Sequence, residues 1–378
     1  MRAIGQLEEL RLWLSCGTEQ FVRQSAAVRA RFPDLYEAFA LAQRKNMSAF
    51  GFLPEIAAQK LVEAAQDGFV ARFIERLIKG NIDFVLDDDD AYPALLSEIH
   101  DPPAVLYIKG RLPVDSALSI AVVGTRGPTE YGRDVAKMVS HALCKAGAVI
   151  VSGMAGGIDS CAARGALDIS DAVCPTVAVL GTGVDVVYPA ENRALYAEIV
   201  SRGAVVSEFL PGTPARSTHF PIRNRVISGL ARGVLVVEAG ERSGTTITAG
   251  YAHEQGREVF AIPGRITDAK SVGTNRLIRD GEAKAVFGAD DILCEFGAAE
   301  AGGAIRVQRV DLTALTEPQR RVVRLLQAGE RTIDELTEET SLPIGELNSL
   351  LTELHFSGII KQLPGRVYAL DTARAVVG

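Results

Sequence analysis

Residues 209–237 form a segment whose residue types suit the binding of a polyanion. The segment contains no Asp or Glu, although the whole chain has 47 acidic residues against 40 basic ones. Its four arginines are Arg216, Arg223, Arg225 and Arg232. Arginine forks pair with phosphates, and Phe220, which lies among the arginines, offers a ring face on which a base can stack. Arginines on a solvated helix face with Phe220 in the core would give the same pattern, so the segment alone leaves both interpretations open.

Three glycine-containing turns follow apolar runs that have the length of strands. They lie at residues 124–127, 152–157 and 243–246. In a doubly wound sheet, ligands bind beyond the carboxyl ends of the strands, where turns bring backbone N–H groups to helix N-termini that stabilise anions. Glycine has no Cβ to block phosphate oxygens. Tight turn geometry explains any one of these turns equally well, but the three together with Arg126 and the arginine segment favour a phosphate site.

Several signatures of enzymes are absent from the sequence. The chain has no GxGxxG after its first strand, no GxxxxGK[ST] and no GxSxG, so NAD binding, a P-loop and a hydrolase elbow are not indicated. Ser243 and His253 could supply a nucleophile and a base, but no third group to orient them is apparent. Asp159 and Glu208 could act as acid or base, although such residues are common at helix starts and strand ends. We predict that the protein is not an enzyme.

Composition and length restrict the class of protein. A chain of 378 residues with 47% hydrophobic residues can form two or three domains with buried cores. The formal charge of −7 means that a nucleic-acid site must be a local basic patch. The five cysteines and five histidines lack metal-ligand spacing, so we expect free thiols, no metal and no cofactor. No apolar run reaches the ~18 residues of a membrane span, and the first residues do not form a signal peptide, which together indicate a cytoplasmic protein.

The hydrophobic pattern divides most of the chain into a helical start and a long βα region. Residues 1–80 have apolar residues at helical spacing and are predicted to form a helical domain of the SAM or helix-hairpin-helix type. Residues 81–296 are predicted to form a Rossmann-like α/β domain, with a short β lead-in followed by a doubly wound, mostly parallel sheet. The acidic run 87–90 in the lead-in could hold a cation, but a solvated loop is the simpler interpretation.

The C-terminal part is predicted to be a winged-helix-like domain. Residues 297–310 are rich in Ala and Gly and indicate a linker. Residues 311–378 contain three helical patterns, of which the first begins after Thr316, and a final β hairpin. The expected recognition helix carries Glu346 and Glu353 but no Lys or Arg, so the phosphates of duplex DNA would repel it. A role in protein interaction is therefore preferred to the reading of duplex DNA.

The ordered motifs between residues 91 and 293 closely resemble the DNA-processing protein A family (DprA, also called Smf). The resemblance rests on IAVVGTRGPTEYG, IVSGMAGGIDSCAARGAL, TVAVLGTGVDVVYPAENRAL, HFPIRNRVISGL and GVLVVEAGERSGTTITAGYAHEQGREVFAIPG. It implies a Rossmann-like domain that binds single-stranded DNA. It also implies DNA contacts by Arg126 of the GTR motif and by Phe220 and the arginines of the F-x-x-R-N-R motif. Ser217 stands where some members have a basic residue.

The turns and the motifs together give the predicted DNA contacts. These are Gly124, Thr125, Arg126, Ser152, Gly153, Gly156, Gly157, Phe220, Arg223, Asn224, Arg225, Ser243, Gly244 and Thr245. The resemblance further implies that the protein protects incoming single strands during natural transformation and recombination, helps to load the RecA recombinase, and acts as a homodimer.

One interpretation from a different class stays open at this point. A Rossmann-like nucleotide hydrolase acting on nucleoside monophosphates would use similar glycine turns, with Glu208 or Glu238 as its acidic group. The DNA-binding interpretation is preferred because a mononucleotide requires fewer arginines and aromatic rings than this chain provides.

Overall fold

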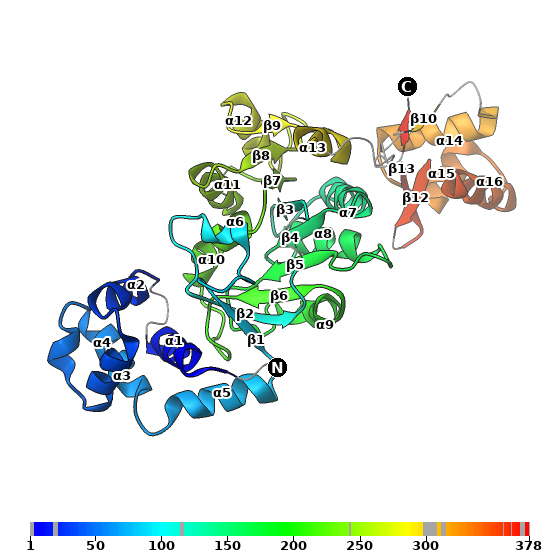
Figure 1. The fold of residues 1–378 in the computed structure, drawn as a ribbon. Coiled ribbons are helices and arrows are strands. Elements are labelled where there is room, and N and C mark those ends of the chain that lie inside the picture. The colour runs from blue at the N-terminus through cyan, green and yellow to red at the C-terminus, as the bar shows by residue number, and fades with distance from the viewer. Residues whose placement is uncertain are drawn as a thin grey trace. The chain divides into compact units, whose positions relative to one another are not determined.

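The computed structural model describes residues 4–17, 22–113, 117–241, 243–297, 308–310, 315–357, 359–363, 365–370 and 375–377. The chain divides into two compact units, Met1–Ala301 and Gly302–Gly378 (Figure 1). The linker predicted at 297–310 falls largely on residues 298–307, which lie outside the described residues. The finer division into four parts, with boundaries near residues 80, 296 and 310, stays a prediction.

Helices form the start of the first unit, as the apolar periodicity predicts. They are α1 (Gln6–Gly17), α2 (Val22–Arg31), α3 (Leu35–Gln43), the 3-10 helix η1 (Met47–Phe50), α4 (Glu55–Ala64) and α5 (Phe69–Lys79). Trp13 is fully buried among them, and its indole Nε1 donates a hydrogen bond of 2.9 Å to the carbonyl oxygen of Leu61. The same apolar core includes Phe84 and Tyr107 of the adjoining strands, so these helices pack directly on one edge of the sheet. The relation to SAM or helix-hairpin-helix folds stays a prediction.

The acidic run 87–90 receives arginine side chains from the helices. Arg11 of α1 pairs with Asp87 and Asp88, and Arg29 of α2 donates to Asp87 at 2.8 Å. Within the described part of the chain, no group of three or more His, Cys, Asp or Glu side chains gathers as a metal site would require. The run is therefore an ion-paired turn that fastens α1 and α2 to the end of the first strand.

The described residues of the first unit contain a nine-stranded sheet in the order β1-β2-β6-β5-β4-β3-β7-β8-β9. Its strands are β1 (Asp83–Leu86), β2 (Val105–Gly110), β3 (Ser119–Val123), β4 (Val149–Ser152), β5 (Thr176–Val179), β6 (Ala204–Ser207), β7 (Gly233–Val236), β8 (Glu258–Ala261) and β9 (Lys284–Ala285). The pairs β1–β2 and β2–β6 are antiparallel, and the other neighbours are parallel. The predicted doubly wound, mostly parallel α/β fold is confirmed.

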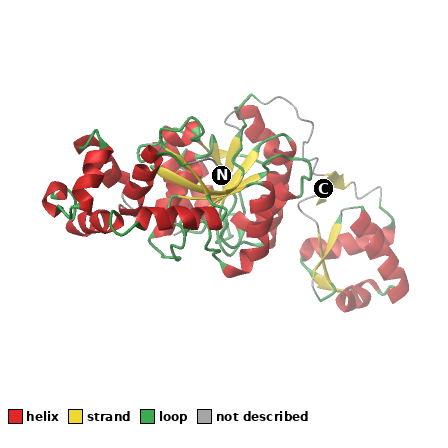
Figure 2. Cartoon of the chain, turned by 60° about the horizontal axis from the view of Figure 1, so that its bottom comes forward, coloured by secondary structure: helices red, strands yellow, loops and turns green. Residues whose placement is uncertain are grey.

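Helices cover both faces of this sheet, as Figure 2 shows. They are α6 (Ala94–Ser97), α7 (Glu130–Lys145), α8 (Ile158–Leu167), η2 (Ala190–Asn192), α9 (Arg193–Arg202), α10 (His219–Gly229), α11 (Thr245–Glu254), α12 (Val272–Arg279) and α13 (Ala289–Glu295). Successive side chains of a strand point to opposite faces. Val177 of β5 accordingly joins the core beneath α10 and α11, whereas Ala178 joins the core beneath α8 and α9. Burial on both faces explains the nearly continuous apolar runs.

The order of the strands reverses at β3. The chain passes from β3 outward through β4, β5 and β6, and then returns to place β7 on the other side of β3. The connections that leave β3 and β7 therefore diverge at the carboxyl ends of these strands. Such a switch point leaves a crevice in which doubly wound proteins bind their ligands.

The second unit contains the predicted winged helix. Its elements are β10 (Gln308–Val310), α14 (Glu317–Ala328), β11 (Arg331–Thr332), α15 (Ile333–Thr340), α16 (Ile344–Phe356), β12 (Ile360–Leu363), β13 (Val367–Leu370) and β14 (Ala375–Val377). Thr316 caps α14 in a capping box with Gln319, which confirms the predicted start of that helix. The small sheet has the order β11-β13-β12, and β13 forms a hairpin with β12.

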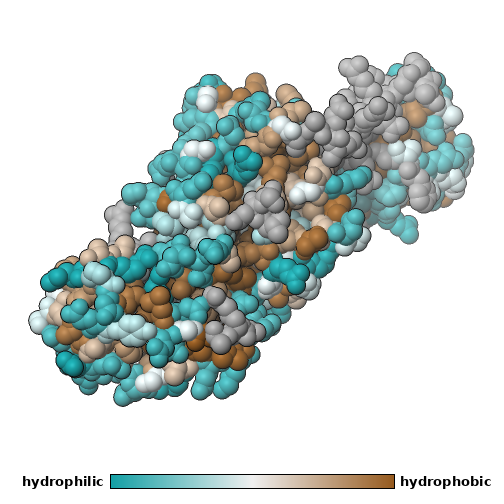
Figure 3. All heavy atoms as spheres, in the orientation of Figure 1, coloured by the Kyte–Doolittle hydropathy of each residue, from teal (hydrophilic) through white to brown (hydrophobic). Residues whose placement is uncertain are grey.

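Hydrophobic and hydrophilic side chains alternate over the face shown in Figure 3. Among the described residues, the large apolar side chains with the greatest exposure include Ile266 and Phe287. No helix in the described ranges has both the length and the apolar character that a membrane crossing requires. The five cysteines are free thiols, of which Cys16, Cys144 and Cys174 are buried.

Candidate nucleic-acid interface

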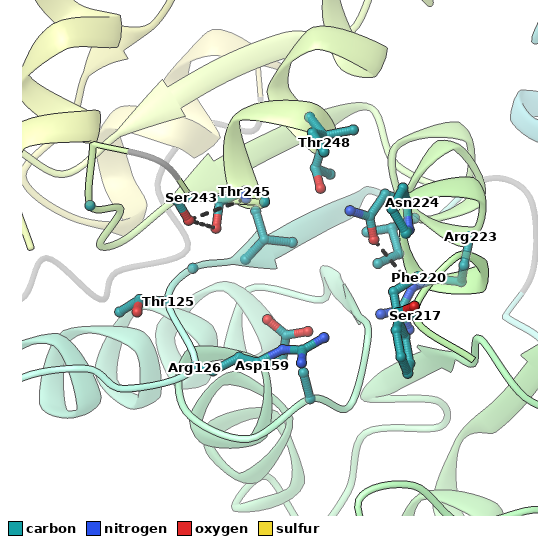
Figure 4. A pocket seen from close by; sticks show the side chains of 18 of the residues that line it. Thr125, Arg126, Asp159, Ser217, Phe220, Arg223, Asn224, Ser243, Thr245 and Thr248 are labelled. Carbon is teal, nitrogen blue, oxygen red and sulfur yellow. Dashed lines mark hydrogen bonds between the residues drawn. The ribbon is translucent and has the colours of Figure 1, made fainter. Parts of the chain in front are cut away.

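A cavity of about 710 Å³ opens at the switch point, beyond the carboxyl ends of β3 and β7. The predicted DNA contacts that line this cavity are Gly124, Thr125, Arg126, Phe220, Arg223, Asn224, Ser243, Gly244 and Thr245. In Figure 4, Arg126 lies on one side of the cavity, Phe220 on another, and Ser243 on a third. The fold therefore brings together side chains that lie up to about a third of the chain apart.

A cluster of two rings and two guanidinium groups borders the cavity. Phe220 is half-buried, and its ring stacks on that of Tyr188 with the centroids 5.4 Å apart and an interplanar angle of 30°. The guanidinium carbons of Arg126 and Arg223 lie 5.2 Å and 6.0 Å from the centroid of the Phe220 ring. These distances are within the range of cation–π attraction. Phe220 is thus part of the cavity wall, which argues against the alternative that places its ring in the core.

Arg223 is held by the protein itself. It is 4% exposed, and its Nη1 donates to the carbonyl oxygen of Gly153 at 2.9 Å and to that of Val179. Burial lowers the pKa of Arg223 to about 10, and the nearby charge of Arg126 acts in the same direction. The group remains a cation at neutral pH, so it contributes a fixed positive charge while tying the turn after β4 to the end of β5.

A carboxyl group, that of Asp159, also lines the cavity. Asp159 is 6% exposed, and its Oδ2 accepts a hydrogen bond of 3.0 Å from the backbone N–H of Gly153. Burial raises the pKa of this carboxyl, while Arg223 provides the largest opposing effect. When ionised, Asp159 offsets part of the positive charge that the arginines supply.

The glycines of the turns differ in how much space surrounds the position that a Cβ would occupy. A Cβ at Gly153 would lie 2.6 Å from the Arg223 guanidinium, and one at Gly157 would lie 2.5 Å from a backbone oxygen. At these positions glycine is needed for packing within the protein. A Cβ at Gly156 or Gly244 would meet nothing within 4 Å. Of these four glycines, Gly156 and Gly244 are the two that leave space that a ligand can enter.

A second cavity of about 370 Å³ shares part of this wall. Gly153 and Gly156 line it together with Gly181, Thr182 and Asn192, and Arg126, Phe220 and Arg223 line it as well as the first cavity. The Phe220 ring therefore borders both cavities. A base could therefore approach the ring from either cavity.

Three predicted contacts do not line either cavity. Ser152 is fully buried at the end of β4, and Gly157 begins α8 against the turn after β3. Arg225 is 9% exposed and forms an ion pair with Glu208 at the end of β6. Arg225 is therefore placed to hold α10 on the sheet, and a direct contact between this side chain and DNA is not supported by the geometry.

Other residues line the first cavity that sequence reasoning did not select. Tyr188 and Lys270 were missed, and Ser217 was considered only as the replacement for a basic residue. The motif TVAVLGTGVDVVYP contains another strand followed by a glycine turn, and this signal could have indicated Tyr188. No comparable local signal precedes Lys270, which lies in a loop between β8 and α12.

The groups considered for catalysis have other partners. Glu208 pairs with Arg225, and Glu238 accepts hydrogen bonds from the backbone N–H and the hydroxyl of Thr129. Ser243 donates its hydroxyl proton to Thr245 at 2.8 Å. His253 follows eight residues after the start of α11, which places it about 12 Å along the helix axis. A nucleophile–base pair of Ser243 and His253 is therefore not formed.

Comparison with known proteins finds matches to one protein family over most of the chain. Residues 83–297 match the family described as DNA recombination-mediator protein A, and residues 309–366 match the DprA winged helix domain. Protein Smf of Synechocystis is 35% identical over 331 residues, which cover 79% of this chain and 82% of that protein.

Two solved structures are also similar. The X-ray structure of DNA processing protein A from Streptococcus pneumoniae has a TM-score of 0.63 and 34% identity, covering 78% of this chain and 99% of that one. A structure of DNA processing protein A from Helicobacter pylori has a TM-score of 0.51 and 29% identity, covering 57% of this chain and 95% of that one. The Helicobacter pylori structure is described as giving insight into a unique single-stranded DNA binding mode of that protein.

Proposed function

Because the chain belongs to the DNA recombination-mediator protein A family, we propose that it binds single-stranded DNA in the cavity bordered by Arg126 and Phe220. The observation that carries this proposal is the position of the exposed Arg126 guanidinium 5.2 Å from the half-buried Phe220 ring, beside two open cavities. A guanidinium group pairs with a phosphate, and an aromatic ring stacks on any base. Duplex DNA hides its base faces, so single strands are the preferred ligand.

The backbone around the cavity supports the same function. Gly244 precedes the first residue of α11 and leaves open space, so a phosphate can approach the positive end of the dipole of this helix. Lys270 adds a second cation to the cavity wall. A strand that passes from this helix end to the Phe220 ring would meet donors for its phosphates and a platform for a base.

We further propose the biological setting that the family resemblance implies. The protein protects incoming single strands during natural transformation and recombination in the cytoplasm, helps to load the RecA recombinase, and acts as a homodimer. It does so without catalysis. The second structural relative supports the DNA-binding part of this proposal, since that protein is described by its binding of single-stranded DNA.

A salt series with a labelled oligothymidylate tests the proposed site. The parent protein should bind the oligonucleotide more tightly than a duplex of the same length, as measured by fluorescence anisotropy. Arg126→Ala should weaken binding and reduce the slope of log K against log salt by about 0.7, the value for one phosphate contact on a single strand. Arg164→Ala, which removes an exposed arginine of α8 that lines neither cavity, should leave the slope unchanged. Equal slopes for Arg126→Ala and the parent would refute the site.

The nucleotide hydrolase is the weaker candidate, because Glu208 and Glu238 are already engaged by other groups of the protein. Incubation with nucleoside 5′-monophosphates tests it directly. Release of free base by the parent protein, abolished by Glu238→Gln, would support the enzyme and overturn the proposal of binding without catalysis.

A further inference from the structure

Two loops carry the rings of the proposed site, and one carboxylate connects them. The loop after β5 carries Tyr188, and the segment after β6 leads into Phe220. Asp185 in the first loop accepts a hydrogen bond of 2.6 Å on its Oδ1 from the backbone N–H of Gly212 in the second. Its Oδ2 accepts a hydrogen bond of 3.1 Å from Arg76 Nη2 of α5. One side chain thus joins both loops to the N-terminal helices.

Further contacts connect the two loops directly. The N–H of Gly183 donates to the carbonyl oxygen of Thr213 at 3.0 Å, and a Cβ at Gly183 would lie 2.6 Å from the Leu210 carbonyl oxygen. Val184 of the first loop and Leu210 of the second both pack into the apolar core of the N-terminal helices. Polar contacts therefore hold the two loops to each other, and apolar contacts hold both of them to the N-terminal helices.

The contacts between the two loops continue up to the rings of Tyr188 and Phe220 at the cavity. His219, which precedes Phe220, is fully buried, and its Nδ1 lies 3.1 Å from the carbonyl oxygen of Gly181 in the first loop. His219 also stacks on Phe209 with the ring centroids 4.2 Å apart. Any change in the separation of the two loops would consequently alter the stacking of Phe220 on Tyr188.

From these contacts we propose that Asp185 is a positioning residue for single-strand binding, and that Arg76 acts through it. This inference rests on the proposed function. Asp185 touches no DNA: it holds the loops at the separation that keeps the rings of Tyr188 and Phe220 stacked at 5.4 Å beside both cavities. The N-terminal helices are thereby part of the binding apparatus, because α5 supplies the cation that orients the carboxylate.

Dissociation of a labelled oligothymidylate from full-length variants tests this role by stopped-flow measurement. Asp185→Ala should raise the dissociation rate about fivefold, the size expected for one lost hydrogen bond. The salt slope should not change, because no phosphate contact is removed. Arg76→Met should raise the rate about twofold, since its partner is partly exposed and the pair is weak. The double variant should match Asp185→Ala alone.

The matched control is Arg72→Met on the same helix. Arg72 bonds the carbonyl oxygen of Asp67 within the N-terminal helices, so its removal changes the net charge equally without touching the contacts between the two loops. It should leave the dissociation rate unchanged. A variant that is partly unfolded would lose binding amplitude, whereas a displaced ring pair changes the rate. Hydrogen exchange at the peptide containing Gly212 should also become faster in Asp185→Ala.

The outcomes separate this inference from the proposed function. If Phe220→Ala and Arg126→Ala weaken binding while Asp185→Ala dissociates at the parent rate, the positioning role is overturned and the site stands. If the effects of Arg76→Met and Asp185→Ala multiply, Arg76 does not act through Asp185. If Phe220→Ala and Arg126→Ala both bind like the parent, the proposed function itself fails.

Discussion

Replacement of Phe220 by alanine is the most direct perturbation of the proposed site. The ring is half-buried, borders both cavities and stacks on Tyr188. Phe220→Ala removes the platform for a base while leaving the guanidinium groups of Arg126 and Arg223 in place. The expected result is weaker binding of single strands with an unchanged salt slope, because stacking releases no counterions.

The magnitude follows from how much of the ring is available. Stacking on an aromatic side chain contributes about 1–3 kcal/mol per base by alanine substitution. Since one side of Phe220 already contacts Tyr188 and the Arg126 guanidinium lies 5.2 Å from its centroid, at most one base stacks on it. We therefore expect the lower part of that range, about 1–2 kcal/mol, which corresponds to a roughly 5- to 30-fold increase in Kd.

Fluorescence anisotropy with an oligothymidylate, repeated over a salt series, measures both quantities. Phe220→Tyr keeps a stacking face and should bind within about twofold of the parent. Phe296→Ala is the matched control: this ring is also half-buried and has the Arg232 guanidinium carbon 5.5 Å from its centroid, but it lines neither cavity. Unchanged affinity in Phe220→Ala, or an equal loss in Phe296→Ala, would refute the stacking argument.

Three further outcomes follow from the same geometry. Tyr188→Ala should weaken single-strand binding about threefold without changing the salt slope, because the Tyr188 ring supports the Phe220 ring from one side. The loss of affinity should be smaller than in Phe220→Ala, and a larger loss would contradict the supporting role of Tyr188. Arg225→Met should lower the free energy of unfolding by about 3 kcal/mol in a denaturant titration, since it leaves the buried Glu208 carboxylate unpaired; Arg225→Met with Glu208→Leu should recover most of that loss. Burial raises the pKa of Asp159 in the folded protein. Protonation of this carboxyl therefore stabilises the folded state, fully at a pH below the ordinary carboxyl pKa, and this stabilisation is lost as the pH rises through the raised pKa. A bound phosphate favours the neutral carboxyl further, so affinity should increase in the parent as the pH is lowered through the raised pKa towards the ordinary carboxyl pKa, and Asp159→Asn should flatten this dependence.

The sequence predicts the elements of the fold well because their signals are local. The runs that form β3 to β8 are short, apolar and followed by turn residues, and each lies where the pattern places a strand. The antiparallel pairing of β2 with β6 joins residues about a hundred positions apart. Nothing in the pattern of either strand specifies that partner, so the edge of the sheet was not predicted beyond a short β lead-in.

The arginine segment shows how far local pattern determines a site. It contains α10, and the residues of this helix that line the first cavity are Phe220, Pro221, Arg223, Asn224 and Ile227. All of these except Pro221 have the spacing i, i+3, i+4 and i+7, which defines one face of a helix. Arg225 lies two residues after Arg223 and therefore about 200° around the axis. The family motif names both arginines, but helical geometry allows only one of them to border this cavity.

The placement of the charges also explains how an acidic chain, with a net charge of −7, can bind a polyanion at one place. Arg223 and Arg225 are nearly buried and are neutralised or held by carbonyl oxygens and by Glu208. Counterions are released from DNA when a cation neutralises a phosphate, and a guanidinium group that is buried against groups of the protein neutralises few phosphates. The salt-dependent part of binding should therefore come mainly from Arg126, which is exposed, and from Lys270. The remainder must come from stacking and from backbone donors, which act on any unpaired strand irrespective of its sequence and fail on a duplex, whose base faces are already covered.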